Sequence, residues 1–314
     1  MKTRRIKTIL LFLSTMPFIG IYAQSIYYVS PHASSGGDGS PATPFHIIHE
    51  AVEKARKDKN CTTIYLREGE YILDTPLVLT SADGNDSKEL IIRNYPGEKA
   101  IISSGITLDL KWEKYKNGIM RAAVKGNPVM DMLIVNGDLR SMARYPDYDK
   151  TAVRFNGTSA LATAPERVKK WKNPEGGYLH AMHSHDWGDF HYRITGKNEK
   201  GELQLEGGWQ NNRPMGIHPE NRMVENIFEE LDAPGEWYYD KQEGWLYYYP
   251  LSDENINELV FETPQLKNLI EIAGTSSHPV KNITIEGIEL TQTIRTFMEH
   301  YEPLLRSDWT IYRG

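Results

Sequence analysis

The densest group of potential ligand side chains is the segment His180-x-x-His183-x-His185-Asp186. In a strand, alternation would place His183 and His185 on one face. The spacing lacks the helical pattern of known zinc signatures, so it argues against a metal site. A polar surface for sugar contact and a structural strand with hydrogen-bonded imidazoles are the two remaining interpretations. Trp187 follows directly and favours the sugar surface, because a flat ring can stack on a sugar face.

A second group combines an aromatic ring, two amides and a guanidinium within one loop. It consists of Trp209, Asn211, Asn212 and Arg213. A polar sugar ring is bound by this chemistry, which offers apolar stacking together with directed hydrogen bonds. An ordinary turn after a strand is the alternative. Arg144, which precedes Tyr-Pro, belongs to a smaller set of the same kind and could equally brace a loop.

Carboxylates are the third group with possible chemistry. Hydrolysis of a glycosidic bond generally uses two carboxylates about 5–10 Å apart. Several acidic residues lie near aromatic residues in the sequence: Asp186, Asp189, Asp232, Glu236 and Asp240. Spacing singles out no pair among them, and the sequence has no serine or cysteine nucleophile motif and no phosphate-binding glycine loop. The catalytic residues therefore stay unassigned, and we expect neither a metal nor a cofactor.

The composition narrows the range of partners. The net charge is −6, and acidic and basic residues are mixed along the chain. The sequence therefore has no cluster of basic residues of the kind that binds nucleic acid. Eighteen tyrosines and seven tryptophans suggest stacking platforms for a polysaccharide or oligosaccharide. The single cysteine, Cys61, excludes a disulfide within the chain.

The first residues have the pattern of a secretory signal. Basic residues precede the apolar run Ile9–Ile21, and Ala23 provides a small residue for cleavage. The run is interrupted by Pro17 and is short for a membrane span, and no later stretch is long enough. We therefore expect residues 1–24 to be a cleaved signal peptide and the protein to be periplasmic or secreted, without a membrane span. No cysteine near the cleavage point could carry a lipid anchor.

Short strands dominate the predicted elements. One amphipathic helix is expected from Phe45 to Lys57, where apolar residues recur at helical spacing. Strands bounded by turn residues are expected at Thr63–Leu66, Glu70–Leu73, Leu77–Thr80, Leu90–Asn94 and Lys99–Ser103. Strands this short, without crossover helices between them, suit a sandwich, a barrel or a solenoid.

Recurring apolar segments favour the solenoid. Asn282–Thr291 alternates as a β-helix coil does, which would point Ile283, Ile285, Ile288 and Leu290 inward. Residues 112–250 differ in composition, being rich in Trp, Tyr, His, Asn and Arg. They contain two predicted hairpins, one between Tyr192 and Leu205 and one in Glu236–Tyr249. We therefore expect an all-β protein: a cap and first coils in 25–111, an inserted antiparallel β domain in 112–250, and a return to coils in 251–314. Because Leu304–Gly314 starts another strand without a polar cap, the chain is expected to be truncated.

The opening segments Tyr27–Pro31 and Ile64–Tyr71 resemble the N-terminal entry of secreted right-handed parallel β-helix proteins. The segments Leu231–Asp240 and Gly244–Pro250 are similar to the insertion domain of glycoside hydrolase family 141. That resemblance covers only the front part of the family, which includes fucosidase and xylanase activities. It implies that the catalytic carboxylates lie on later coils, so none is carried over to a position here.

The sequence thus predicts the N-terminal portion of a secreted glycoside hydrolase-like β-helix protein that is inactive as a fragment. Two alternatives stay open. One is a non-catalytic solenoid for glycan binding or adhesion, in which the aromatic insertion binds the glycan. The other is a polysaccharide lyase, which would need a basic residue and usually a cation.

Overall fold

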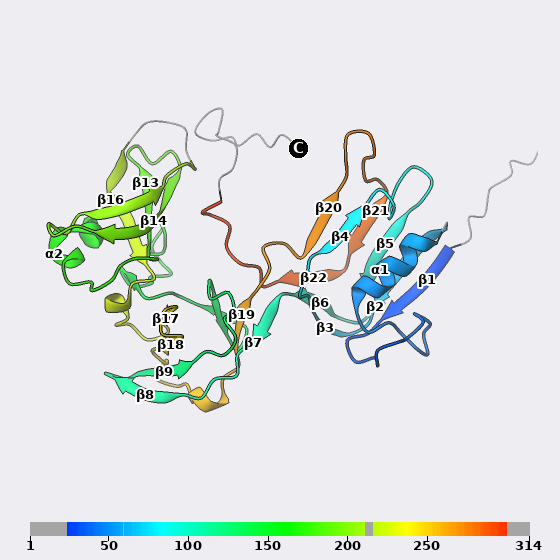
Figure 1. The fold of residues 1–314 in the computed structure, drawn as a ribbon, viewed down its shortest axis with the longest axis horizontal. Helices are drawn as coiled ribbons and strands as arrows, with labels where there is room; N and C mark the ends of the chain where they lie inside the picture. Colours follow the sequence, from blue (N-terminus) through cyan, green and yellow to red (C-terminus); the bar gives the residue numbers. More distant parts are fainter. Residues whose placement is uncertain (1–23, 59, 211–215, 300–314) are drawn as a thin grey trace, which may run out of the picture. The chain divides into compact units, whose positions relative to one another are not determined.

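A computed structural model describes residues 24–58, 60–210 and 216–299. These residues form two compact units, each assembled from separate stretches of the chain (Figure 1). The first contains the chain up to Glu68 together with Leu79–Glu98 and Ile272–Gly287. The second contains Gly69–Val78, Lys99–Glu271 and the chain from Ile288. The predicted signal peptide and the predicted final strand lie almost entirely outside the described residues.

The first unit is built around a four-stranded parallel sheet. Its order is β1-β2-β5-β21, with bounds Gln24–Val29, Cys61–Leu66, Leu90–Asn94 and Ile283–Glu286. Every pairing is in simple register: Ile64 is aligned with Ile92, and Ile92 with Ile285. The alternation of buried Ile64 and Leu66 with partly exposed Tyr65 on β2 shows which face of the sheet packs inward.

The second unit contains strands that directly follow three of these four parallel strands along the chain. Strand β3 (Gly69–Ile72) pairs in parallel with β6 (Ala100–Ser103), and β6 pairs in parallel with β22 (Ile288–Thr291). Strands β4 (Leu77–Thr80) and β20 (Ile270–Ala273) form a two-stranded sheet. Thus β2 is followed by β3, β5 by β6 and β21 by β22. The same pair of strands, one from each parallel sheet, therefore occurs three times along the chain.

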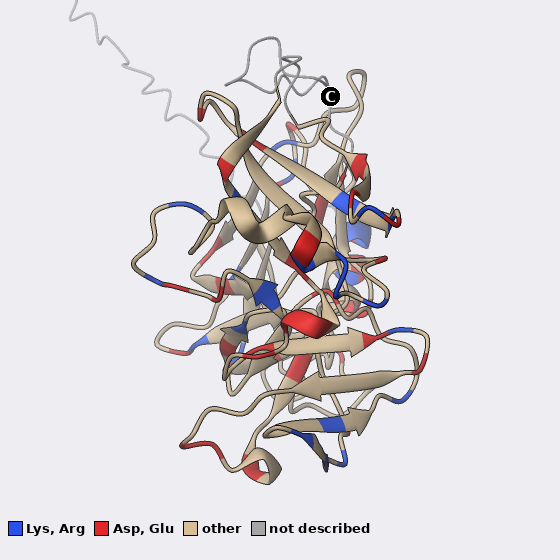
Figure 2. Cartoon of the chain, turned by 90° about the vertical axis from the view of Figure 1, so that its left-hand side faces the viewer, with Lys and Arg blue, Asp and Glu red and all other residues tan. Residues whose placement is uncertain are grey.

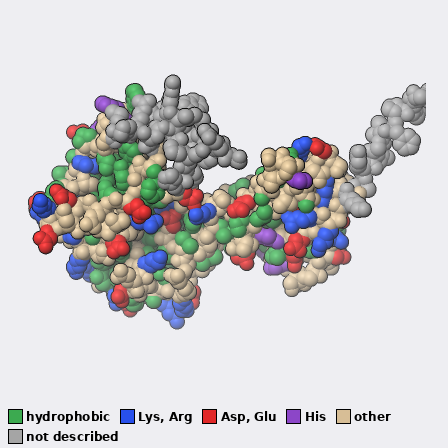
Figure 3. Space-filling view, turned by 45° about the horizontal axis from the view of Figure 1, so that its top comes forward, with side chains coloured by type: hydrophobic (Ala, Val, Ile, Leu, Met, Phe, Trp, Pro, Cys, Tyr) green, Lys and Arg blue, Asp and Glu red, His purple; other side chains and the backbone are tan. Residues whose placement is uncertain are grey.

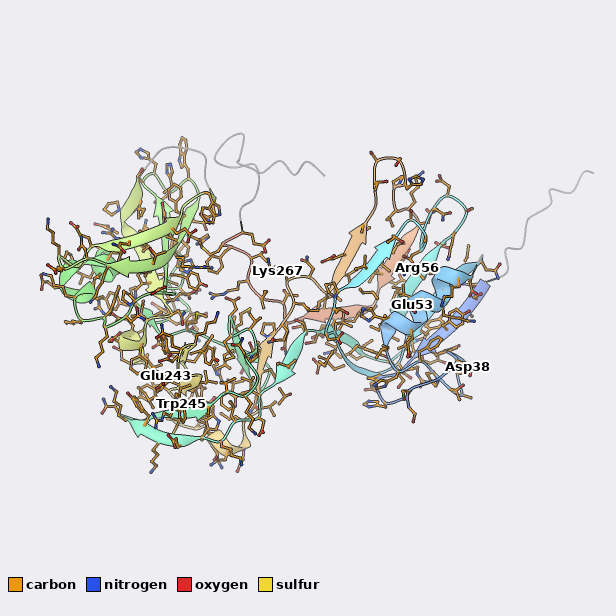
Figure 4. The ribbon with its side chains drawn as sticks, viewed as in Figure 1. Asp38, Glu53, Arg56, Glu243, Trp245 and Lys267 are labelled. Atoms are coloured by element: carbon orange, nitrogen blue, oxygen red, sulfur yellow. The ribbon has the colours of Figure 1, made fainter. Side chains whose placement is uncertain are left out.

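A helix lies beside the first strands of the first unit. Helix α1 (Ile48–Lys57) buries Ile48, Ala51, Val52 and Ala55 on one side, as its apolar spacing predicts. Beside this buried face Arg56 (Figure 4) donates two hydrogen bonds, of 2.9 and 3.0 Å, to the fully buried carboxylate of Asp83. The same carboxylate accepts from the backbone amide of Thr80 at 2.8 Å, so it joins the helix to the turn after β4.

Substituting Asp83 with Asn should lower the free energy of unfolding by about 1.5–3 kcal/mol, because a charge-assisted pair with Arg56 becomes a neutral contact. Chemical denaturation followed by circular dichroism measures the change. Glu53→Gln, on the exposed side of the same helix, is the matched control and should change stability by no more than about 0.5 kcal/mol. Equal effects of the two substitutions would contradict the assigned role of Asp83.

The largest sheet of the second unit is antiparallel and five-stranded, with the order β12-β16-β13-β14-β15. The strand bounds are Arg144–Tyr145, Ile217–Glu225, Tyr178–His183, Asp189–Lys197 and Leu203–Gly207. One face packs on a core that includes Trp171, Leu179, Ile194 and Val224. The short helices η1 (Ala160–Thr163) and α2 (Pro165–Val168) supply Ala162 and Val168 to the same core.

Two further antiparallel sheets complete the second unit. One has the order β17-β18-β9-β8, with bounds Trp237–Asp240, Trp245–Tyr248, Ile119–Ala123 and Glu113–Lys116. The other has the order β11-β10-β19-β7, with bounds Asp138–Arg140, Leu133–Val135, Phe261–Pro264 and Gly105–Thr107. Trp237, Tyr248 and Phe261 pack together between them. The turns η2 (Phe228–Glu230) and η3 (Ile256–Glu258) flank these strands.

The structure confirms the all-β class and both predicted hairpins: Ile194 pairs with Leu205, and Tyr238 pairs with Tyr247. The coil Asn282–Thr291 is present as β21 and β22, but its predicted inward side chains are only partly buried, and Leu290 is 51 % exposed. The reason is that both strands are edge strands in the sheets that the structure describes. Across the described ranges, no helix is long and apolar enough to cross a membrane.

Candidate functional site

The turn that joins β13 to β14 presents the most exposed tryptophan among the described residues. Trp187 is 57 % exposed. His185 is also exposed in this turn, whereas His183 ends β13 and has none of its surface exposed. The strand therefore stops before His185, so the two histidines do not share a strand face, although their ring centroids lie 5.9 Å apart. Instead the His185 backbone amide donates to His183 Nδ1 at 3.0 Å. His183 therefore stabilises the turn from inside and contributes no exposed surface to it.

Asp186 fixes the same turn to the rest of the sheet. Its φ of +58° is a left-handed conformation that Asp tolerates better than most residues. Its two carboxylate oxygens accept from Arg154 Nη2 at 2.8 Å and from Asn221 Nδ2 at 2.9 Å. These two bonds fix the position of Asp186 in the turn. Trp187 is the next residue, so the Arg154 guanidinium and the Asn221 amide lie close to the part of the turn that carries it.

The other predicted site residues lie in different environments. Trp209 follows β15, is partly buried, and donates from Nε1 to the backbone carbonyl of Glu299 at 3.1 Å. Asn211, Asn212 and Arg213 lie outside the described residues. Arg144 is buried on β12, so it offers little surface to a glycan.

Arg144 braces a loop, which is one of the two roles that its sequence context allows. It donates to the carbonyls of Pro146 at 2.7 Å, Phe155 at 2.7 Å and Gly157 at 3.1 Å. Phe155 has a φ of +47°, a strained value for a bulky residue, and Arg144 holds that segment in place. As a result the Phe155 ring lies 6.1 Å from the ring of His180.

His180 belongs to a buried network of charged groups on the same sheet. Its Nδ1 lies 2.7 Å from Nδ1 of His191, and its Nε2 lies 3.2 Å from Oε1 of Glu225. Arg295 Nη1 donates to the same Glu225 oxygen at 2.5 Å and Arg295 Nη2 donates to Asp131 Oδ1 at 3.0 Å. Five chain segments therefore meet through titratable side chains in a largely buried place: the residue before β10, strands β13, β14 and β16, and the segment after β22.

Burial and charge set the protonation of this network. Burial lowers the pKa of His180, although Glu225 acts in the opposite direction. Burial alone would raise the pKa of Glu225, but the hydrogen bond from His180 and the charge and hydrogen bonding of Arg295 outweigh it and hold that pKa well below its usual range. Burial would lower the pKa of Arg295, and Glu225 and Asp131 raise it overall. The favoured state is a carboxylate between an uncharged imidazole and a guanidinium.

The candidate carboxylates are mostly occupied in local structure. Asp240 Oδ1 accepts from the amides of Gln242 and Glu243 in the β17–β18 turn, at 2.9 and 3.0 Å. Glu236 is only 2 % exposed, and burial raises its pKa to about 8. Asp232 is exposed as a residue, but partial desolvation of its carboxyl group and the nearby charge of Asp147 raise its pKa.

Sequence reasoning missed four members of the buried network: Asp131, His191, Glu225 and Arg295. These residues can be identified only from their proximity in the folded chain, because Arg295 is separated from Asp131 by 164 residues and from Glu225 by 70. No local motif connects positions so far apart. The one available signal was the run of histidines itself, since His180 is its first residue.

Surface charge and ligand geometry add two observations. Acidic and basic residues alternate along the elements drawn in Figure 2, and their side chains are interspersed on the face shown in Figure 3. Within the ranges that the structure describes, no group of three or more His, Cys, Asp or Glu side chains is arranged to hold a metal ion.

Comparison with known proteins gives a fold likeness. No protein-family model matches the sequence. The uncharacterized protein YwoF of Bacillus subtilis (strain 168) is 34 % identical over 88 residues, which is 27 % of this chain and 17 % of YwoF. A solved structure described as a glycoside hydrolase superposes with a TM-score of 0.70 and 22 % identity, covering 86 % of this chain and 51 % of its own.

A second solved structure, the complex of XylC with xylose, matches with a TM-score of 0.38 and 14 % identity, covering 84 % of this chain and 35 % of that one. This score is too low to support an argument. The chain thus spans about half the length of the glycoside hydrolase with which it shares its fold.

Proposed function

We propose that this chain is the N-terminal portion of a secreted, glycan-acting protein of the glycoside hydrolase kind, built on a right-handed parallel β-helix with an inserted antiparallel domain in residues 112–250. The observation that carries the proposal is the fold likeness to a glycoside hydrolase over 86 % of the chain. The repeated parallel order β2-β3, β5-β6 and β21-β22 supports the β-helix. Stacked strands of this kind extend a single core in one direction.

The glycan contact in this proposal is the β13–β14 turn. Trp187 offers an exposed ring for stacking on the apolar face of a sugar. Arg154 and Asn221, which anchor Asp186, place polar groups beside the turn. We expect the hydrolytic carboxylates of the whole protein to lie outside the described residues, because Glu236 is buried and Asp240 is engaged in a turn.

The same observation about carboxylates favours a second candidate function, a non-catalytic glycan-binding solenoid. The two functions differ in turnover and agree on binding. Incubating the chain with neutral plant-type polysaccharides and measuring released reducing ends separates them: release would assign catalysis to this chain, while binding without release fits either a binding module or a portion of a larger enzyme.

Substituting Trp187 with Ala should weaken glycan binding roughly 5–10-fold, on the order of 1 kcal/mol, because the stacking surface is lost. Titration calorimetry against soluble xylan and fucosylated oligosaccharides measures the affinity. Tyr148→Ala removes another exposed ring, 55 % exposed, and serves as the control. If the Trp187 variant binds as tightly as the unaltered protein, the turn is not the contact surface; if the unaltered protein binds none of these glycans, the proposed function itself fails.

A further inference from the structure

The chain segment after β22, residues 293–299, is attached to the five-stranded sheet by side chains that come from several strands. We refer to it as the strap segment. Its Arg295 backbone amide donates to Asp131 Oδ2 at 2.7 Å and its guanidinium reaches Glu225. The Phe297 ring lies 5.1 Å from that of His180 and 5.2 Å from that of His191.

Gln210 adds a polar connection between the strap segment and the sheet. Its Oε1 accepts from the His191 backbone amide at 3.1 Å, while its Nε2 donates to the Phe297 carbonyl at 3.0 Å. The strap segment is therefore held by two ion pairs of Arg295, by one ring cluster and by one amide bridge. Glu225, the Phe297 ring and Gln210 each also contact one or both of the two histidines.

The short contact between the two imidazoles limits the number of protons they can carry. Two Nδ1 atoms 2.7 Å apart can share one proton, with one ring donating and the other accepting. His180 Nε2 faces the Glu225 carboxylate, so we assign its proton to Nε2, and its Nδ1 then accepts from His191. A further proton on His180 Nδ1 would oppose the His191 N–H and break this contact.

We propose that His180, His191, Glu225 and Arg295 form an acid-sensitive clasp, which holds the strap segment on the five-stranded sheet at neutral pH and releases it when His180 takes up a second ring proton. Release exposes the Phe297 contact face on the sheet and frees the segment that continues from β22.

The charged groups around His180 explain why a second ring proton on His180 should destabilise the closed clasp. His191 on β14 and Arg295 in the strap segment both disfavour a positive His180, whereas Glu225 on β16 favours it.

Further charged and titratable groups surround these residues. Asp131 lies before β10 and Asp189 lies on β14, and Tyr178 on β13 is in ring contact with Phe297. Arg144 on β12 and Arg193 on β14 add positive charge near Glu225 and Tyr178 respectively. Glu225 and Asp131 are each already bonded to Arg295, which reduces their ability to stabilise a new cation.

The sign of the pH effect follows from the histidine. Burial lowers the pKa of His180 below its ordinary 6.5 in the closed clasp, so the open form binds more protons in mildly acidic solution. Clasp stability is therefore complete above about pH 6.5 and falls as the pH decreases below it. The pKa values of Glu225 and Asp189 are both lowered, so these two carboxylates stay ionised in this range and do not cause the opening.

Hydrogen–deuterium exchange of the full chain at about pH 7.5 and about pH 5.5, corrected for intrinsic exchange, tests the clasp. Protection of the Arg295 amide should fall on the order of tenfold at the lower pH, while amides of β2 and β5 in the parallel sheet keep theirs. His180→Gln should remove the pH response, since the amide can still donate to Glu225 but does not titrate. His278→Gln, at an exposed histidine, is the control and should respond like the unaltered protein.

Unchanged protection of the Arg295 amide between the two pH values would overturn the proposal, as would a full pH response in His180→Gln. Equal loss of protection in β2 and β5 would also overturn it, because that outcome means global unfolding. The comparison of the unaltered protein at the two pH values decides the question even if the His180 variant does not fold.

Discussion

Substituting Glu236 with Gln is expected to raise the free energy of unfolding by about 2–4 kcal/mol at about pH 7.5. The carboxyl group is buried, and burial raises its pKa to about 8 from 4.5. Its Oε2 accepts only two long hydrogen bonds, at 3.3 and 3.4 Å, from the amides of Ala233 and Asp232. Glutamine retains the acceptor and the volume but has no proton to lose.

The pH dependence identifies the cause of this stabilisation. In the folded protein Glu236 keeps its proton up to about pH 8, whereas in the unfolded chain it loses the proton near 4.5. The folded state therefore loses stability as the pH rises from 4.5 towards 8, and below 4.5 the substitution should have little effect. Urea denaturation at several pH values measures this slope. Glu243→Gln, at an exposed position on the β17–β18 turn, is the matched control (Figure 4). A pH-independent gain in stability would show that packing, and not titration, is responsible.

Substituting Glu230 with Ala is expected to lower the free energy of unfolding by about 3–5 kcal/mol, because it leaves buried polar partners unpaired. Glu230 is 3 % exposed, and its carboxylate accepts from Trp171 Nε1 at 2.6 Å and from Arg167 Nη1 at 2.6 Å. Without it, a fully buried indole N–H in the core of the five-stranded sheet has lost its acceptor.

Thermal and chemical denaturation of the Glu230 variant measure this loss. Glu166→Ala is the control: its side chain is 87 % exposed and pairs with Lys169 at the surface, so its removal should cost less than about 0.5 kcal/mol. Glu230→Gln should fall between the two, because the amide oxygen can still accept from Trp171. A Glu230→Ala loss as small as that of the control would mean that the indole finds another acceptor.

Local patterns in the sequence were sufficient to predict most strands of the parallel sheets. Leu77–Thr80 and Leu90–Asn94 occupy the predicted ranges, and Cys61–Leu66 starts two residues earlier than expected. These segments combine β-branched or leucine residues with flanking turn residues, so their conformation depends on nearby chain. The helix beginning at Ile48 was predictable for the same reason, since its apolar spacing is continuous.

The candidate site was less predictable, because its properties depend on residues distant in the sequence. The sugar contact expected of Trp187 stays a prediction, and a strand face shared by His183 and His185 required a strand that in fact ends at His183. Arg144 was open to two interpretations until its contacts with the carbonyls of Phe155 and Gly157 were known. The raised pKa of Glu236 follows mainly from burial, and burial is a property of the assembled core.

The pairing of β6 with β22 has a consequence for how the chain folds. Next to this pairing, Ser104 Oγ donates to the Gln292 carbonyl across 188 residues of chain. Closing so long a loop from an unfolded state has an entropic cost of roughly 4–5 kcal/mol before any contact forms. Folding the intervening antiparallel sheets first brings the two ends close together and removes most of that cost. The middle of this sequence should therefore become ordered before its two flanks join, so that the strands farthest apart along the chain are the last to meet.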